Sequence, residues 1–430
     1  MECFCVMNEE IEGRIDPFYY KREFIKFRNP LFKFKIVELR ELIKDCKTGL
    51  PIRKDQRIEG GKYPYYGANG IIGYMDKFTH EGLFLVVSQD GYIGNHYVVN
   101  GKFWASNHNW VIKLKEGLNE RYVKFILDLI NYNYLVTGGV IPKLTKEALE
   151  KIKIPFPSLE IQNKIVSLMD EAYLSKKSKE IESQKLLDSI NDYVLDELGI
   201  KLPELEDKMT YVVGSEEVKN NRCDSYYFQP KFEEIEKAVS KGKFEVKEIE
   251  KGIIVSNKLE NLEDYNSINY VDLSSINKNL GLIKNYDKLN IEEAPSRARQ
   301  KLEKGDLLLS GLVGSLKSIA IFEGNFNNAI CSTGFYVIKN SKNYNNYYLW
   351  ALFRSDILQM LLQRESSGAI MSAINREALS KLKIPLPPLS VQNKIADEVK
   401  KRMQKAESLQ REAKEELEKA KLEVEKIILG

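Results

Sequence analysis

The feature that most constrains the fold of this chain is a segment that occurs twice. Residues 151–165 (KIKIPFPSLEIQNKI) and residues 381–395 (KLKIPLPPLSVQNKI) are identical at 10 of 15 positions without a gap, at an offset of 230 residues. The match extends backwards through TKEALE at 145–150 and NREALS at 375–380. An internal repeat indicates one structural unit built twice along the chain.

A second pattern, RxDxxY, marks the start of each half. It consists of Arg14, Asp16 and Tyr19, and then of Arg222, Asp224 and Tyr227. Between the landmarks the halves diverge, and they share only a strand followed by a glycine turn, in GLFLVVSQDGYIGN (82–95) and GDLLLSGLVGSLKS (305–318). A repeated framework with divergent middles is the pattern expected of one scaffold that presents two different recognition surfaces.

A helical run of about 40 residues follows each IPFP or IPLPP segment. Apolar residues recur there at spacings of three and four, from Ile161 to Val194 and from Val391 to Ile427, with dense Glu and Lys between them. This pattern is typical of coiled-coil helices, and each helix would be about 60 Å long. The middles are rich in Tyr, Val, Ile, Gly and Asn, which favours short strands and tight turns. Among the candidate strands is NYVDLSSI (269–276), and the candidate helices include 121–130 and 347–362.

We therefore predict the α+β class, with two α+β domains that are each followed by a long helix. The predicted boundaries are 1–157 for the first domain with a short N-terminal tail, 158–200 for the first helix, 201–220 for a linker, 221–387 for the second domain and 388–430 for the second helix.

Charge and missing motifs exclude several functions. Of 430 residues, 65 are Lys or Arg and 62 are Asp or Glu, so the net charge of +3 excludes a uniformly basic nucleic-acid binder. Both predicted domains are mildly basic, whereas residues 159–220 carry a net charge of −6. There is no GxxxxGK[ST] phosphate loop, no Asn/Asp-Pro-Pro-aromatic methyltransferase motif and no GxSxG elbow. We attribute the nuclease-like Glu-x-Lys triplets at 245–247 and 398–400 to chance, and we expect a chain without catalysis of its own.

The cysteines and histidines predict neither a metal site nor a disulfide framework. The five cysteines form no CxxC, and His80, His96 and His108 are not at ligand spacing from cysteines. The first residues carry acids without a positively flanked apolar segment, and no stretch approaches the ~20 apolar residues of a membrane span. We expect a cytoplasmic protein without a membrane association.

The doubled motif resembles the DNA specificity subunit of type I restriction-modification systems. The residues that carry the resemblance are Ile154-Pro155-Phe156-Pro157 with Leu159, Gln162 and Ile165, and Ile384-Pro385-Leu386-Pro387-Pro388 with Leu389, Gln392 and Ile395. The resemblance implies two target recognition domains, joined by two helices that pack as an antiparallel coiled coil. Each domain would read one half of a bipartite, asymmetric site in double-stranded DNA. The helices would act as a ruler between the domains.

The resemblance also implies a division of labour with partner subunits. Two modification subunits would dock on the helices and bring S-adenosylmethionine and adenine-N6 methylation. Restriction subunits, which are motor nucleases, would bring ATP, Mg and DNA cleavage. We expect no cofactor and no metal in this chain itself.

Residues in or beside predicted turns are the DNA-contact candidates, because Arg and Lys pair with guanine and Asn and Gln with adenine. In the first domain they are Arg53, Lys54, Arg57, Lys62, Tyr65, Tyr66, Asn69, Gln89, Asn95, His96, Asn107, His108 and Lys143. In the second they are Ser274, Asn277, Lys278, Ser296, Arg297, Arg299, Lys317 and Ser318. For the two tyrosines a core position is an equal alternative, and for His96 and His108 a polar surface or strand-end position is favoured.

The repeated polar residues are expected to serve the framework or partner docking. They are Arg14, Asp16, Tyr19, Gln162, Arg222, Asp224, Tyr227 and Gln392. For the two glutamines, capping of the helix start and contact with a partner are equally compatible with the sequence. Three other functions stay open: a specificity chain whose partner combines methyltransferase and nuclease in one polypeptide, a coiled-coil adaptor that binds protein and not DNA, and a cryptic nuclease.

Overall fold

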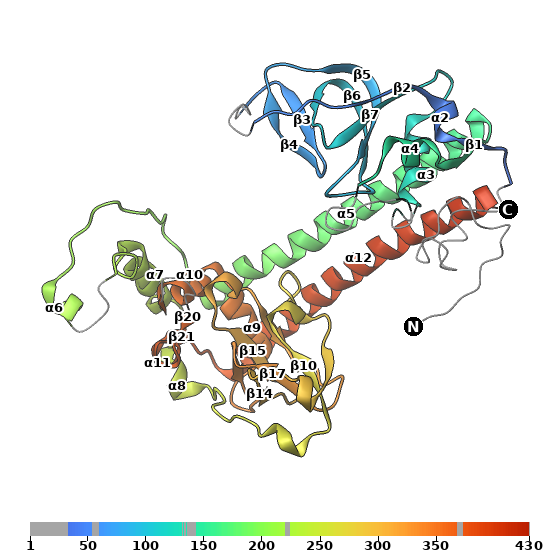
Figure 1. Ribbon diagram of the computed structural model, residues 1–430. Helices are drawn as coiled ribbons and strands as arrows, with labels where there is room; N and C mark the ends of the chain where they lie inside the picture. The colour runs from blue at the N-terminus through green and yellow to red at the C-terminus, as the bar shows by residue number, and fades with distance from the viewer. Residues whose placement is uncertain are drawn as a thin grey trace. The chain divides into compact units, whose positions relative to one another are not determined.

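The computed structural model describes residues 33–53, 60–130, 132, 135, 143–219, 224–367 and 373–429 (Figure 1). The chain divides into two compact units, Met1–Lys177 with Ala413–Gly430, and Ser178–Glu412. Two long helices, α5 (Leu159–Leu198) and α12 (Leu389–Leu429), each contribute to both units. Each unit also contains its own sheets and shorter helices, as expected for the α+β class.

Besides its segments of α5 and α12, the described part of the first unit is mainly β-structure. Its strands are β1 (Ile36–Glu38), β2 (Ile43–Thr48), β3 (Tyr63–Gly67), β4 (Gly70–Met75), β5 (His80–Ser88), β6 (His96–Ala105), β7 (Asn109–Leu114) and β8 (Lys153–Pro155). Its short helices are α2 (Leu39–Leu42), α3 (Glu120–Asp128) and α4 (Lys146–Glu150). The predicted helix at 121–130 is thus present as α3, which begins where the Asn119 side chain accepts from the backbone N–H groups of Arg121 and Tyr122.

The six-stranded sheet of the first unit has the order β2-β7-β5-β6-β3-β4, and all pairs are antiparallel except β3 with β6. Although three pairings separate β7 from β3, the Asn109 side chain in β7 donates to the backbone oxygen of Tyr66 in β3 at 3.0 Å. This bond requires a strongly curved sheet, in which the ends of β3, β5 and β7 come together.

The described part of the second unit has shorter elements. Its strands are β9 (Val246–Glu248), β10 (Ser267–Val271), β11 (Ile276–Asn277), β12 (Leu282–Ile283), β13 (Asp287–Asn290), β14 (Ala298–Lys301), β15 (Leu307–Ser310), β16 (Ile319–Ile321), β17 (Ala329–Ser332), β18 (Phe335–Ile338), β19 (Ser366–Ser367), β20 (Ala373–Ile374) and β21 (Lys383–Pro385). Its helices, besides α5 and α12, are α6 (Ser215–Lys219), α7 (Pro230–Ser240), α8 (Ile249–Gly252), α9 (Asn346–Arg354), α10 (Asp356–Arg364) and α11 (Arg376–Lys381). The 3₁₀ turns are η5 (Leu262–Asp264), η6 (Leu273–Ser275), η7 (Ile291–Glu293) and η8 (Val313–Ser315). Its two larger sheets are four-stranded, β13-β10-β17-β14, and three-stranded, β16-β15-β18. Its main core is formed by the three-stranded sheet together with α7, α9, α10 and segments of α5 and α12.

Two sequence predictions for the second unit differ from the structure. The candidate strand 269–276 is interrupted because the Asp272 carboxylate accepts from the backbone N–H groups of Ser274 and Ser275, which stabilises η6 in place of a strand. The predicted helix 347–362 is divided into α9 and α10 at Ser355, which is extended and caps α10. Short polar side chains that bond to the local backbone cause both interruptions.

In each unit, the segments of α5 and α12 pack against one another in antiparallel directions. In the second unit, residues 179, 183, 189 and 197 of α5 bond to residues 412, 406, 402 and 394 of α12, respectively. In the first unit the Ser175 hydroxyl bonds to the Glu416 carboxylate at 2.5 Å. The predicted apolar positions of both helices are buried or half-buried. At the end of α12, Ile428 is buried and the predicted Ile427 is only half-buried.

The repeated IPFP and IPLPP segments take the same local structure in both units. Strand β8 pairs with β1, and β21 pairs with β9, each antiparallel. A fully buried tyrosine donates its hydroxyl to a proline carbonyl of the repeated segment in each case, Tyr122 to Pro155 and Tyr348 to Pro385, both at 2.7 Å. These contacts fix the start of α5 and of α12 against the body of its own unit.

Candidate nucleic-acid interface

The repeated glutamines make the same two hydrogen bonds in both halves. The Gln162 amide oxygen accepts from the backbone N–H of Asn119 at 3.2 Å, and its nitrogen donates to Pro157 O at 3.0 Å. The Gln392 amide accepts from Asn345 N–H at 2.9 Å and donates to Pro387 O at 2.8 Å. Both glutamine side chains are buried.

The asparagine that follows each glutamine extends the same arrangement. Asn163 accepts from the Asn119 amide at 2.8 Å, and Asn393 accepts from the Asn345 amide at 2.9 Å. Since Asn119 and Asn345 also cap α3 and α9, the long helices are tied to the caps of these helices. The contacts favour a framework role for the glutamines over partner docking.

Of the repeated RxDxxY residues, Arg14, Asp16, Tyr19 and Arg222 lie outside the described residues. The two that can be described, Asp224 and Tyr227, are half-buried in the second unit. The Asp224 carboxylate accepts from the backbone N–H of Tyr227 at 2.9 Å. The ring of Tyr227 lies 5.3 Å from the guanidinium of Arg364, which pairs with Glu236 at 2.6 Å.

In the first unit, three connections between strands gather several of the DNA-contact candidates. The Asn95 side chain, in the β5–β6 connection, donates to Ala68 O and to Asn69 Oδ1 in the β3–β4 turn, at 3.3 and 3.2 Å. Nδ1 of His108, in the β6–β7 turn, lies 2.7 Å from the Asp90 carboxylate in the β5–β6 connection. We call these connections, with Lys143, the first loop cluster.

Lys143 and Asn107 complete the first loop cluster. Lys143 forms an isolated β-bridge with Asp90 and is exposed, as is Asn107 beside His108. The cluster thus presents amide, imidazole and ammonium groups, which are the groups that contact base edges and phosphates. Asp90 was not among the candidates predicted from the sequence, although it directly follows the candidate Gln89.

Three candidates of the first unit are core residues. Tyr65 and Gln89 are 3% exposed and His96 is 4% exposed. The Gln89 amide donates to the backbone oxygen of Asn107, which holds the β6–β7 turn in place. These three buried side chains are not available to DNA.

His96 is held between two polar groups in the interior. Its Nδ1 lies 2.9 Å from the Asp128 carboxylate and its Nε2 lies 2.8 Å from the Tyr132 hydroxyl. Burial lowers the pKa of His96, although the hydrogen bond to Asp128 opposes that shift. His96 is therefore a structural residue of the first unit.

The other candidates of the first unit are scattered. Lys54 and Arg57 lie outside the described residues. Arg53 is exposed in the segment after β2, and Tyr66 is half-buried and packs edge-on against Phe103. Lys62 is exposed and lies just before β3, whereas Asn69 lies beyond the other end of that strand.

In the second unit, Asp272 links two of the candidate residues. Its carboxylate accepts from the Ser274 hydroxyl at 2.6 Å and lies 3.7 Å from a guanidinium nitrogen of Arg297. Nε of Arg297 also donates to the Tyr270 hydroxyl at 3.1 Å, while the side chain remains 60% exposed. Asp272 is a second positioning acid that the sequence reasoning did not single out.

The neighbouring candidates divide between surface and interior. Ser296 is exposed, and Arg299 is half-buried with Nε donating to Ser296 O at 3.2 Å. Lys278 and Lys317 are exposed and line one hollow of about 550 Å³. Ser318, in contrast, is buried.

Asn277 has a structural role in the turn after β11. Its side-chain oxygen accepts from the backbone N–H groups of Asn279 and Leu280, at 3.1 and 3.2 Å. We call the exposed residues Ser274, Lys278, Ser296, Arg297 and Lys317 the second loop cluster.

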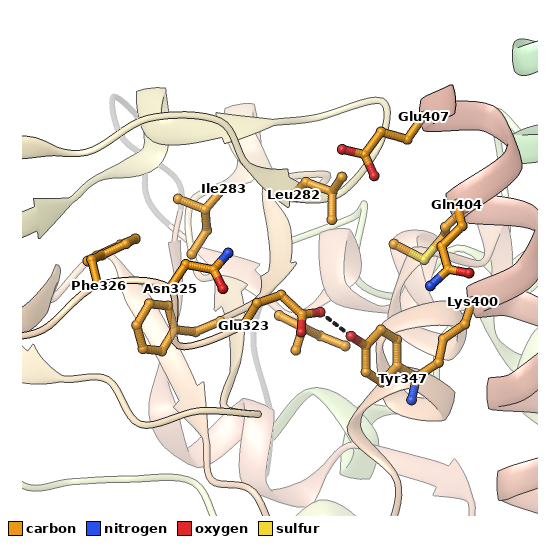
Figure 2. Close-up of a pocket in the computed structure, with 12 residues that line it drawn as sticks. Leu282, Ile283, Glu323, Asn325, Phe326, Tyr347, Lys400, Gln404 and Glu407 are labelled. Carbon is orange, nitrogen blue, oxygen red and sulfur yellow. Dashed lines mark hydrogen bonds between the residues drawn. The ribbon is translucent and has the colours of Figure 1, made fainter. Parts of the chain in front are cut away.

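A different hollow of the second unit, of about 450 Å³, lies between β12 and α12 (Figure 2). Tyr347 donates its hydroxyl to the Glu323 carboxylate there, and the Lys400 ammonium lies 3.9 Å from the centre of the Tyr347 ring. None of the DNA-contact candidates that the structure describes lines this hollow. We therefore do not assign this hollow to the candidate interface.

The nuclease-like triplets are engaged in ordinary surface ion pairs. Glu245 pairs with Lys247 at 3.0 Å and Glu398 with Arg402 at 2.8 Å. Among the residues that the structure describes, no group of three or more His, Cys, Asp or Glu could hold a metal ion. In the same residues no helix is both long and apolar enough to span a bilayer.

Comparison with known proteins gives consistent similarities. Residues 33–186 and 243–419 match the family described as Type I restriction modification DNA specificity domain. The chain is 40% identical over 124 residues to a putative type I restriction enzyme specificity subunit of Haemophilus influenzae, and 28% identical over 158 residues to the EcoprrI specificity subunit of Escherichia coli. These matches cover 28% and 36% of this chain, and only 32% and 39% of the two relatives.

The fold has a counterpart among solved structures. The crystal structure of a type I restriction-modification S subunit from M. genitalium covers 93% of this chain and 97% of its own, with a TM-score of 0.52 at 16% identity. At this identity the likeness concerns the fold alone. It confirms the prediction of two α+β domains with long helices.

Proposed function

The chain belongs to the type I restriction-modification DNA specificity family, and on that basis we propose that it is the subunit of a type I restriction-modification complex that reads the DNA sequence. The observation that carries the proposal is the presence of two family segments, 33–186 and 243–419, in one chain. Each segment includes one of the two loop clusters. Their different residues on a repeated framework favour a DNA site with two different halves.

The domain assignment follows the repeat. We assign residues 1–157 and 221–387 to the two target recognition domains, and 158–200 and 388–430 to the helices that join them through the linker 201–220. Two modification subunits would dock on the helices and carry out adenine-N6 methylation with S-adenosylmethionine, while restriction subunits would use ATP and Mg. This chain would supply binding and no catalysis.

The exposed members of the loop clusters form the proposed contact set. They are Asn69, Asn107, His108 and Lys143 in the first domain, and Ser274, Lys278, Ser296, Arg297 and Lys317 in the second. Because Asp90 binds Nδ1 of His108, Nε2 is the ring nitrogen left for a base or phosphate. Asp272 similarly limits the positions of Arg297, and side chains held in this way lose less entropy on binding.

Single substitutions in each domain test this proposal. We expect Asn107→Ala to relax specificity only in one half of the site, and Arg297→Ala only in the other half, with a loss of about 1–3 kcal/mol of base discrimination each. Asn100→Ala, an exposed asparagine in β6 away from the cluster, is the matched control. Binding is measured for the complex with its modification subunits on duplexes substituted base by base.

The adaptor alternative makes the opposite prediction. A protein that contacts phosphates loses DNA affinity steeply as the salt concentration rises, whereas a coiled-coil adaptor would show no salt-dependent DNA affinity. A partner that combines methyltransferase and nuclease in one polypeptide would leave the DNA-binding results unchanged, and isolation of the native complex would identify it by its composition.

A further inference from the structure

The guanidinium of Arg354 joins two loops of the second unit that lie far apart in the sequence. Arg354 is the last residue of α9. Its Nη1 donates to Lys278 O at 2.9 Å and to Lys317 O at 3.3 Å, and its Nη2 donates to Asn279 O at 2.8 Å. One side chain thereby holds the turn after β11 against the loop that follows η8.

Trp350 lies four residues before Arg354 in α9 and packs against the same turn after β11. The Arg354 guanidinium lies 4.8 Å from the centre of the Trp350 ring, and the indole N–H donates to Ile319 O at 3.2 Å. Gly281 closes the turn with φ of +64°, and a Cβ atom there would lie 2.4 Å from the Trp350 ring. The turn therefore rests directly on the indole, and Arg354 fastens its edge.

The charge of Arg354 is not neutralised by these contacts. Within the described residues its hydrogen bonds go to backbone carbonyls and to no carboxylate. Burial lowers the pKa of Arg354 to about 10, which still leaves the group protonated at neutral pH. A planar guanidinium with several donors can join separate carbonyl groups in a way that a single ammonium cannot.

Both lysines whose carbonyls are held in this way have exposed side chains. Lys278 and Lys317 line the hollow of about 550 Å³, together with Gly314, Ser315 and the amide side chains of α10. Asp356 is the acid in this lining. A neighbouring hollow, which shares the two lysines, also contains Asp188 and Asp192, so an anion is expected on the side of Gly314 and Ser315.

We propose that Arg354 is a positioning residue that fixes Lys278 and Lys317 as a pair, so that both contact the phosphate backbone of DNA at the second half of the site. This inference rests on the proposed function and deepens it. Phosphate contacts of this kind set the register of a reading domain on the duplex. Arg354 holds the two lysines together without contacting DNA itself.

The test measures how the affinity of the full chain for DNA depends on salt. Fluorescence anisotropy with a labelled duplex of random sequence gives the slope of log K against log salt concentration. Each phosphate contact contributes a slope of about −0.9. We therefore expect the double variant Lys278→Gln/Lys317→Gln to reduce the magnitude of the slope by about 1.8, and we expect Lys241→Gln/Lys342→Gln, at two exposed lysines elsewhere, to leave it near that of the wild type.

The role of Arg354 is tested by Arg354→Lys, which preserves the charge and removes the bridging geometry. The proposal predicts a reduced slope for Arg354→Lys, and no further reduction when it is added to the lysine double variant, because residues that act together are not additive. If Arg354 acted only through its charge, Arg354→Lys would keep the wild-type slope, and that result would refute the positioning role. Thermal unfolding of each variant verifies that it folds.

The possible failures are distinguishable. If the wild-type chain shows no salt-dependent affinity for DNA, the proposed function fails. If the wild type shows it and the lysine double variant has the same slope, the proposed function stands and the phosphate pair is refuted. The double variant changes exposed side chains only, so we expect it to fold as the wild type does.

Discussion

Substitution of the repeated glutamines separates a framework role from partner docking. In Gln392→Ala, the half-buried backbone N–H of Asn345 and the buried carbonyl of Pro387 both lose their side-chain partner. At about 1–3 kcal/mol for each orphaned group, we expect a loss of about 2–6 kcal/mol in the stability of the second unit. That is a large share of the ~5–15 kcal/mol that stabilises a typical domain.

Hydrogen exchange is the suitable assay, because a chain with two units does not unfold in one two-state step. Gln392→Ala should reduce amide protection in α9 and β21 and leave α3 and β8 unchanged. Gln162→Ala should do the reverse, by a similar amount, because its two hydrogen bonds are the same. Gln404→Ala, an exposed glutamine of α12, is the control and should change neither region.

The reasoning would be refuted if Gln392→Ala left the protection of the isolated chain unchanged and weakened only its binding to a modification subunit. That result would assign the glutamine to partner docking. A loss of protection in the isolated chain together with normal assembly would assign it to the framework.

Two further predictions concern the helices and the first unit. Insertion of four residues near Ser183 in α5 and near Leu409 in α12 adds about 6 Å to each helix. Because one base pair spans about 3.4 Å, the DNA spacer should lengthen by about two base pairs. A survey of methylated sites measures the spacer, and an unchanged spacer would exclude the role of the helices as a ruler. Because burial lowers the pKa of His96 in the folded state, the unfolded chain binds that proton more readily, so the first unit should lose stability as the pH falls below about 6.5. Thermal unfolding between about pH 5 and 8 should show this loss, and His96→Gln should reduce it.

The repeated parts of the fold were predictable from the sequence because they depend on local patterns. The apolar spacing of three and four in 159–198 and 389–429 leads directly to α5 and α12, with an error of one position at Ile428. The interruption at Asp272 was harder to foresee, because the side chain competes with strand formation through bonds that the apolar pattern does not show.

The candidate interface was predictable only as a set of turns. Residue type and turn position indicated Asn69, His108 and Lys278, which are exposed. The same criteria also selected Gln89 and His96, which are buried and bond to Asn107 O and to the Asp128 carboxylate of α3, respectively. Tertiary contacts determine whether such a turn residue is exposed or buried, and no local sequence pattern predicts these contacts.

Arg354 was not predicted from the sequence for the same reason. It lies in the middle of the predicted helix 347–362, and it ends a helix only in the structure, so nothing local marks it as a partner of residues 278 and 317. Its importance depends on two loops that meet only in the folded unit.

Sequencing of the methylated adenines in the host genome, with and without this gene, tests the central proposal most directly. We predict that N6-methyladenine at one bipartite, asymmetric motif is present with the gene and lost without it. Variants of the first loop cluster should change one half of that motif and variants of the second loop cluster the other half. A methylation pattern that does not change when the gene is removed would contradict the assignment of this chain as the sequence-reading subunit.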